Sequence, residues 1–200
     1  MKKILTVLSL LILFCGCRSC PQGFAQEGAP MKKRIVMIIP EDQFRDEELL
    51  RPKEMFIKKG IYVSIASTTT DKVKGMLGAE VVPDALIENV RAVDFDVVLF
   101  VGGIGASQYW DDQTAHQLAN EANNSGRIVA AICIAPVTLA RAGILNGKRA
   151  TVYPSDSKEL TAKGADYTGR PVERDDNIIT ASGPESAGEF AQTIIDALNI

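Results

Sequence analysis

The sequence predicts an α/β protein with a mostly parallel central sheet that is covered by helices on both faces. Short apolar runs rich in β-branched residues alternate with amphipathic segments along the chain. Such alternation places the strands side by side, with the connecting helices packed on both faces. The length of 200 residues fits one domain with a short appendage, and no repeat or second domain is evident.

The first half of the domain is predicted as two strands flanking a helix, followed by an irregular segment. Residues 34–40 (RIVMIIP) have the β-branched character of a buried parallel strand. Residues 47–59 carry apolar side chains at helical spacing and end before Gly60, a typical helix stop. Residues 61–66 return to the strand pattern. Residues 72–93, with two glycines and a proline, fit short strands and turns.

The second half of the domain repeats this alternation. Residues 96–101 (DVVLFV) form the clearest buried strand and run into Gly102-Gly103. The remaining strands are residues 127–132 and 177–181, and the helices are residues 112–124, 135–142 and 185–198.

Composition and charge exclude several classes of protein. Apolar residues make up 46% and charged residues 24% of the chain, which excludes disorder, collagen, coiled coils and polytopic membrane proteins. The chain has 22 basic and 25 acidic residues, and three of the basic ones lie in the first 20 residues. The remainder has 19 basic residues and a net charge of 19 − 25 = −6. Such a domain is not expected to bind nucleic acid.

Residues 1–20 are predicted as the leader of an exported lipoprotein. Lys2 and Lys3 precede an apolar run over residues 4–14, which is shorter than the roughly 20 residues that cross a bilayer but suits a secretory signal. Gly16-Cys17 resembles the lipobox of bacterial lipoproteins, in which Cys17 is lipidated. The protein is then expected to be periplasmic or membrane-anchored, with the lipid as its only membrane contact.

Two alternatives to the lipoprotein remain open. The small residues of Gly23-Phe24-Ala25 suit cleavage by a signal peptidase, which would give a plainly exported protein. Alternatively, Met31 is the true start and the protein is cytoplasmic. In the lipoprotein reading, residues 21–33 are a polar tether and residues 34–200 the folded domain.

Cysteine usage draws attention to Cys133. The other three cysteines lie in the leader, so the domain has neither an internal disulfide nor a cysteine-rich metal site. Cys133 directly follows a predicted strand, and Pro136 suits the first turn of the next helix, as in a nucleophile elbow. The helix N-terminus would favour the thiolate. The alternative is that Cys133 is simply a small buried hydrophobe.

Other candidate groups are less specific. Gly102-Gly103-Ile104-Gly105 departs from the dinucleotide-binding pattern and better fits a turn whose backbone N–H groups approach a substrate oxygen, or merely a turn that needs positive φ. The acidic residues of segment 41–48 are expected mostly in solvent. His116, the only histidine, lies off the apolar stripe of its helix and is also expected in solvent, so Cys133 lacks an obvious base.

Residues 130–136 (AAICIAP) resemble the cysteine elbow of the DJ-1/PfpI superfamily. The resemblance extends through residues 44–49 (FRDEEL) with Pro52, residues 101–103 (VGG) and residues 181–184 (ASGP), in the family order. It implies a flavodoxin-like three-layer sandwich that is usually a homodimer. No cofactor or metal is expected.

The resemblance also implies roles for particular residues. Cys133 would be the reactive thiol, with Glu48 as a protonated partner acid. The backbone at Gly103 and Ile134 would supply anion-binding donors. Two positions at which family members carry histidine are Ile134 and Tyr153 here, which argues against a peptidase. Tyr153 is expected near the thiol, but its ordinary pKa of about 10 makes it a poor base.

Two functions from different classes follow from this resemblance. In the first, Cys133 attacks small reactive carbonyls while Glu48 shuttles a proton, as in glyoxalases or deglycases. In the second, the protein is a non-enzymatic, stress-protective sensor whose thiol is oxidised reversibly. The expected partners are therefore a small carbonyl compound or an oxidant. A binding scaffold with an inert cysteine is the remaining alternative.

Overall fold

The computed structural model describes residues 32–200. The predicted leader with Cys17, the alternative start at Met31 and most of the predicted tether lie outside the described residues. Among residues 32–200, no helix has both the length and the apolar character needed to span a membrane.

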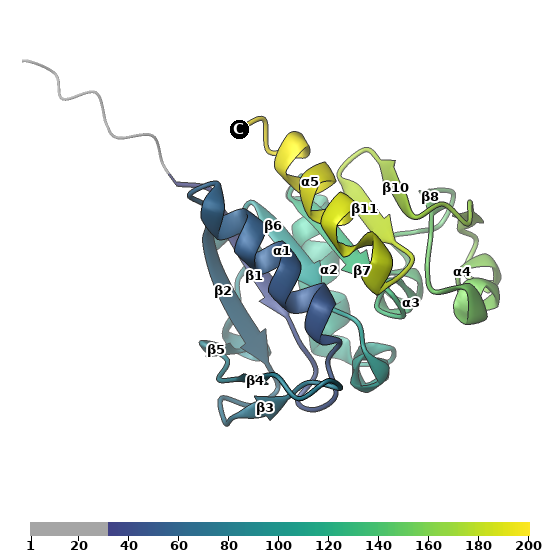
Figure 1. Cartoon of the computed structure of the whole chain (residues 1–200). Helices are drawn as coiled ribbons and strands as arrows, with labels where there is room; N and C mark the ends of the chain where they lie inside the picture. Colours follow the sequence, from purple (N-terminus) through teal and green to yellow (C-terminus); the bar gives the residue numbers. More distant parts are fainter. Residues whose placement is uncertain (1–31) are drawn as a thin grey trace, which may run out of the picture. The chain divides into compact units, whose positions relative to one another are not determined.

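A seven-stranded sheet in the order β10-β11-β7-β6-β1-β2-β5 forms the centre of the domain (Figure 1). Every neighbouring pair is parallel except β10 with β11, which confirms the predicted mostly parallel sheet. The strands are β1 (Arg34–Ile38), β2 (Tyr62–Ser67), β5 (Ala85–Leu86), β6 (Val97–Phe100), β7 (Ile128–Ile132), β10 (Val172–Asp175) and β11 (Ile178–Ala181).

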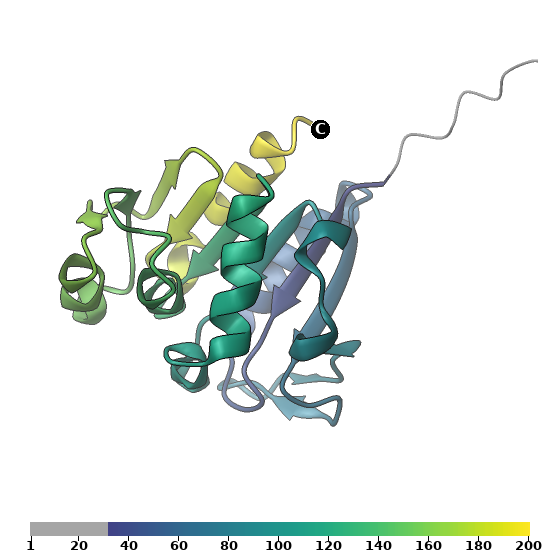
Figure 2. The same ribbon diagram turned by 180° about the vertical axis from the view of Figure 1, so that it is seen from behind.

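Helices cover both faces of the sheet, so the three-layer sandwich is confirmed (Figures 1 and 2). Alternate residues of β1 point to opposite faces: Ile35 and Met37 pack with α1 and α5, and Val36 and Ile38 pack with the α2 and α3 side. The helices are α1 (Asp46–Lys58), α2 (Gln113–Asn124), α3 (Pro136–Arg141), α4 (Ser157–Ala162) and α5 (Ala187–Ala197).

Smaller elements connect these layers. β3 (Val73–Lys74) and β4 (Glu80–Val81) form an antiparallel pair in the segment predicted as short strands and turns. β8 (Arg149–Ala150) pairs with β9 (Asp166–Tyr167). The 3-10 helices are Ile87–Asn89, Ala92–Asp94, Ile104–Tyr109, Pro154–Asp156 and Pro184–Ser186.

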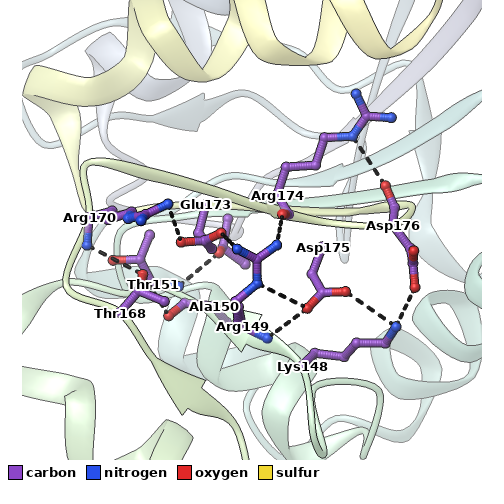
Figure 3. A network of polar contacts seen from close by, with 11 residues as sticks. Lys148, Arg149, Ala150, Thr151, Thr168, Arg170, Glu173, Arg174, Asp175 and Asp176 are labelled. Atoms are coloured by element: carbon purple, nitrogen blue, oxygen red, sulfur yellow. Dashed lines mark hydrogen bonds and ion pairs between the residues drawn. The ribbon is translucent and has the colours of Figure 1, made fainter.

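Residues 148–176 contain five elements that the sequence did not predict: β8, the 3-10 helix Pro154–Asp156, α4, β9 and β10. Ion pairs connect β8 to β10, with Arg149 pairing with both Glu173 and Asp175 (Figure 3). These ion pairs form a group that we call the ionic cluster, which consists of Lys148, Arg149, Arg170, Glu173, Asp175 and Asp176.

Candidate active site

Four parallel strands, β1, β6, β7 and β11, end at the same edge of the sheet, where ligands of open α/β sheets bind. A cavity of about 300 Å³ opens there. Its wall includes four of the predicted site residues, which are Gly103, Cys133, Ile134 and Tyr153. The fold therefore brings together residues that are up to fifty positions apart in the chain.

Cys133 sits on a strained turn between β7 and α3. Its φ is 63°, in the left-handed region that residues other than glycine rarely occupy. The turn is held by neighbouring segments: the Cys133 N–H donates to the Ala181 carbonyl at 2.9 Å, and the Tyr153 N–H donates to the Cys133 carbonyl at 2.8 Å. The Trp110 indole N–H donates to the Ile134 carbonyl at 3.2 Å. These contacts maintain a strained backbone with the thiol only 8% exposed.

Glu48 reaches the thiol from the first turn of α1 and is fully buried. Its Oε2 accepts the Gly102 N–H at 3.1 Å, whereas Oε1 has no hydrogen-bond partner among residues 32–200. A Cβ atom on Gly102 would lie 2.5 Å from both Glu48 Oε2 and the Cβ of Cys133. Glycine at this position therefore allows the carboxyl and the thiol to converge.

Burial raises the pKa of Glu48 to about 8, although contact with Cys133, the Gly102 N–H and the charge of Arg45 act against this. Glu48 is therefore mostly protonated at neutral pH, as the resemblance implies. A protonated carboxyl is also consistent with the unpartnered Oε1, because a neutral carboxyl is less costly to bury without a partner than a carboxylate.

Burial, followed by repulsion from the Glu48 carboxylate, raises the pKa of Cys133 to about 12. The N–H groups of Gly103 and Ile134 lower it. The N–H of Ile134, near the start of α3, thus acts toward the thiolate in the expected direction, but burial outweighs it. Since the repulsion acts only while Glu48 is ionised, the two groups titrate as a coupled pair.

The glycine turn after β6 carries one of the backbone donors that face the sulfur. Gly103 has a φ of 99°, and a Cβ there would lie 2.4 Å from the Arg45 nitrogen and the Gln43 carbonyl oxygen. The turn therefore requires glycine for both conformation and space, and its N–H favours negative charge on Cys133.

The two remaining candidate side chains differ in their placement. Tyr153 is 44% exposed on the cavity wall, with its ring near Gly183. His116 is half-buried rather than exposed, because its Nε2 lies 2.8 Å from the Trp110 carbonyl. It does not line the cavity. Within residues 32–200, no group of three or more His, Cys, Asp or Glu side chains is arranged to hold a metal ion.

Sequence reasoning missed two residues of this site. The Trp110 indole donates a hydrogen bond to the elbow from a distant segment, and no local sequence pattern predicts that contact. Arg45 lies within the recognised FRDEEL segment, but only the structure shows that it lines the cavity.

The family model described as DJ-1/PfpI family matches residues 33–197. The chain belongs to the DJ-1/PfpI family. A solved structure, a ThiJ/PfpI domain protein from Brachyspira murdochii, resembles it with a TM-score of 0.82 and 34% identity, covering 84% of this chain and 98% of that one.

Two curated relatives of this DJ-1/PfpI protein are informative. An uncharacterized protein of Methanocaldococcus jannaschii is 38% identical over 99% of this chain and 98% of its own length. A glutathione-independent glyoxalase of Caenorhabditis elegans is 30% identical over 85% of this chain and 90% of its own length. The family is thus shown by the model and by relatives of similar length.

Proposed function

We propose that this DJ-1/PfpI protein is a cofactor-independent enzyme that acts on small reactive carbonyls, of the glyoxalase or deglycase type. The observation that carries the proposal is the convergence of the buried Glu48 carboxyl and the Cys133 thiol on Gly102, beside a small cavity. Similarity to a glyoxalase of C. elegans supports the same reaction class.

The reaction begins with attack of the Cys133 sulfur on an aldehyde carbon. The thiol proton passes to the ionised Glu48 carboxylate, whose raised pKa makes it a stronger base than an ordinary carboxylate. The carbonyl oxygen, held by the N–H groups of Gly103 and Ile134, then takes that proton to give a hemithioacetal.

A 2-oxoaldehyde substrate completes the cycle without an external oxidant or reductant. Glu48 removes the hydrogen of the former aldehyde carbon as a proton and returns it to the neighbouring carbon, while the hemithioacetal hydroxyl proton moves to the neighbouring oxygen, giving a 2-hydroxyacyl thioester. Water hydrolyses the thioester, releases the 2-hydroxy acid and restores the thiol. A peptidase mechanism is not proposed, because the family's histidine positions hold Ile134 and Tyr153.

The second candidate function is a cysteine oxidation sensor. It is favoured by the absence of a histidine from the residues that line the cavity, since peroxide oxidation of a thiol to the sulfenic acid requires no such base. A sensor is modified once per signal, whereas an enzyme restores its thiol in every cycle.

Turnover distinguishes the two functions. The full chain is incubated with methylglyoxal, and lactate is counted per molecule of protein. We expect many equivalents from the unaltered protein, none above background from Cys133→Ser, and at least about a hundredfold fewer from Glu48→Gln. One equivalent or less from the unaltered protein, with reversible oxidation of Cys133 by hydrogen peroxide, would favour the sensor.

We also propose a homodimer and export as a lipoprotein through Cys17, with a cytoplasmic protein starting at Met31 as the alternative. Sedimentation equilibrium measures the oligomeric state. Labelling of the membrane fraction with a radioactive fatty acid, lost in Cys17→Ala, tests the lipid anchor.

A further inference from the structure

The cavity beside Cys133 has a charged side chain that the proposed reaction does not use. Arg45 immediately precedes α1 and lines the cavity together with Cys133 and Gly103. Its guanidinium is near enough to Cys133 and Glu48 for its charge to interact with both. A cation therefore stands beside the nucleophile.

The guanidinium of Arg45 is held in place by Glu47 and still has donors to offer. Nε donates to Glu47 Oε2 at 2.9 Å, and Nη2 donates to Oε1 at 3.1 Å. In the described part of the chain, no hydrogen bond engages Nη1. Because Glu47 fixes the planar fork, its remaining N–H groups are oriented in advance for an anionic ligand group.

The order of the strands places opposite charges on the two sides of the thiol. Arg45 follows β1, Gly103 follows β6, Cys133 follows β7 and Glu185 follows β11, and these strands are neighbours in that order. Both Arg45 and Glu185 line the cavity. The Arg45 N–H donates to the Gly102 carbonyl at 3.0 Å, and Gly102 adjoins Cys133, so the Arg45 side chain starts close to the thiol.

This arrangement orients a ligand that carries a carboxylate. Arg45 attracts the carboxylate and Glu185 repels it, so the reactive carbon of the ligand is left between them, opposite Cys133. The cavity of about 300 Å³ lies at the lower end of the range for small-molecule sites, which suits a compact ligand.

We infer that Arg45 is the carboxylate-binding residue of the site, and that the site prefers 2-oxoaldehydes bearing a carboxylate over neutral ones such as methylglyoxal. This inference rests on the proposed function for its reaction. The bonds change as described there: the sulfur–carbon bond forms, the carbonyl π bond opens, and the thiol proton reaches the carbonyl oxygen through Glu48. The inference adds one contact to that reaction: Arg45 binds the carboxylate at the other end of the substrate.

Two alkylating reagents test the binding role without requiring turnover. Iodoacetate and iodoacetamide react with the same sulfur and lose the same iodide, but only iodoacetate carries a carboxylate. The ratio of their rates therefore cancels changes in the reactivity of the thiol itself. In the full chain, the tryptic fragment of residues 128–141 contains Cys133 alone, so mass spectrometry follows this one thiol.

We expect the iodoacetate-to-iodoacetamide ratio of Cys133 to exceed its value in the urea-unfolded chain about tenfold. Arg45→Met should return the ratio to the unfolded value, and Arg45→Lys should retain most of the preference because it keeps the charge. Arg51→Met is the matched control, since Arg51 is exposed on α1, which Arg45 precedes, and lies against Gly188 instead of the cavity. Equal ratios for the unaltered protein and Arg45→Met would overturn the inference.

Turnover separates this inference from the proposed function. We expect kcat/KM for 4,5-dioxopentanoate to exceed that for methylglyoxal about tenfold, and Arg45→Met to remove the difference. If neither compound is converted while Arg45→Met still abolishes the preference for iodoacetate, the proposed function fails and the binding role of Arg45 stands. If methylglyoxal is converted but the iodoacetate-to-iodoacetamide ratio does not depend on Arg45, the proposed function stands and the binding role of Arg45 fails.

Discussion

In the proposed mechanism, the reactivity of Cys133 depends on the protonation state of Glu48, because both side chains lie against Gly102. Burial favours the neutral form of each group, and ionising either one makes ionisation of the other harder. A proton that leaves the sulfur therefore has the Glu48 carboxylate as its nearest acceptor. In the proposed reaction the Glu48 carboxylate takes the thiol proton as the sulfur attacks, which links reactivity to the pKa of a carboxyl.

The pH dependence of Cys133 alkylation should show this link. Because the pKa of Glu48 is raised to about 8, its ionised fraction grows through that pH, and the rate with iodoacetamide should rise with an apparent pKa near 8. Glu48→Gln cannot accept a proton and does not repel a thiolate, so the inflection should be replaced by one that follows the thiol alone. Rates are measured on the fragment of residues 128–141 between pH 6 and pH 10. An unchanged inflection in Glu48→Gln would assign it to another group.

Gly102 provides the space in which the pair meets. In Gly102→Ala the new Cβ would lie 2.5 Å from Cys133 Cβ and Glu48 Oε2 and 2.8 Å from the Ile132 carbonyl oxygen, and the last of these is backbone that cannot turn away. We expect activity to fall at least about a hundredfold, and the free energy of unfolding to fall by about 1–3 kcal/mol.

Gly188→Ala is the control for this overpacking. A Cβ at Gly188 meets only the far end of the flexible Arg51 side chain, in the first turn of α5. Alanine there should leave activity unchanged and should not lower the free energy of unfolding, because alanine favours a helix by up to about 1 kcal/mol over glycine. Urea denaturation and methylglyoxal turnover measure both variants. Equal activities in the two variants would mean that the pair tolerates separation.

At the scale of elements, the sequence predicts the centre of the domain well and its edge poorly. Strands β1, β6 and β7 are buried on both faces, so each is a continuous apolar run that stands out in the sequence. By contrast, β10 (VERD) is an antiparallel edge strand with two exposed or half-exposed charged residues and no apolar run. It is held by antiparallel pairing with β11 and by ion pairs such as that with Arg149, and the ion pairs follow no local pattern.

The residues of the candidate site likewise fall into those that the sequence predicts and those that only the structure shows. Cys133 and Glu48 belong to short local motifs at the ends of predicted elements, so sequence reasoning reached both. The position of Arg45 in the cavity depends on the order of β1, β6 and β7 in the sheet, and the role of Trp110 depends on a contact across that order. Such contacts exist only after the chain has folded.

Trp110 connects the 3-10 helix Ile104–Tyr109 to the elbow at the start of α3. Its indole N–H bonds to the Ile134 carbonyl, and the Arg141 guanidinium lies 5.1 Å from the centre of its ring. Arg141 in turn pairs with Asp111 and Glu159. These contacts hold the peptide next to the Ile134 N–H that faces the sulfur.

Trp110→Phe should loosen the elbow without removing the ring. The Ile134 carbonyl keeps its bond from the Val137 N–H, so we expect a loss of only about 1 kcal/mol in the free energy of unfolding. Alkylation of Cys133 should slow several-fold, since the neighbouring N–H is less well aimed. Quenched time courses of Cys133 alkylation, compared at equal folded fraction, measure this change in rate. An unaltered rate together with lower stability would limit Trp110 to a structural role.

At the scale of the whole molecule, the ionic cluster connects the edge of the sheet to the active site. Tyr153, whose N–H donates to the Cys133 carbonyl, follows β8 closely. The ionic cluster joins β8 to the edge strand β10 (Figure 3). Glu173 lies at its centre, with a side chain only 2% exposed between Arg149 and Arg170. A buried carboxylate with cationic partners on both sides is costly to disturb.

Glu173→Gln should therefore weaken both the edge and the contact with the elbow. Removing the carboxylate leaves Arg149 and Arg170 facing each other without it, and we expect a loss of about 1–3 kcal/mol in the free energy of unfolding, reduced because both arginines are more than half exposed. Glu189→Gln, an exposed change on α5, is the control.

Hydrogen exchange tests the connection to the elbow. The Tyr153 amide, which donates to the Cys133 carbonyl, should exchange faster in Glu173→Gln only. Equal protection of Tyr153 in both variants would mean that the elbow is held independently of the sheet edge.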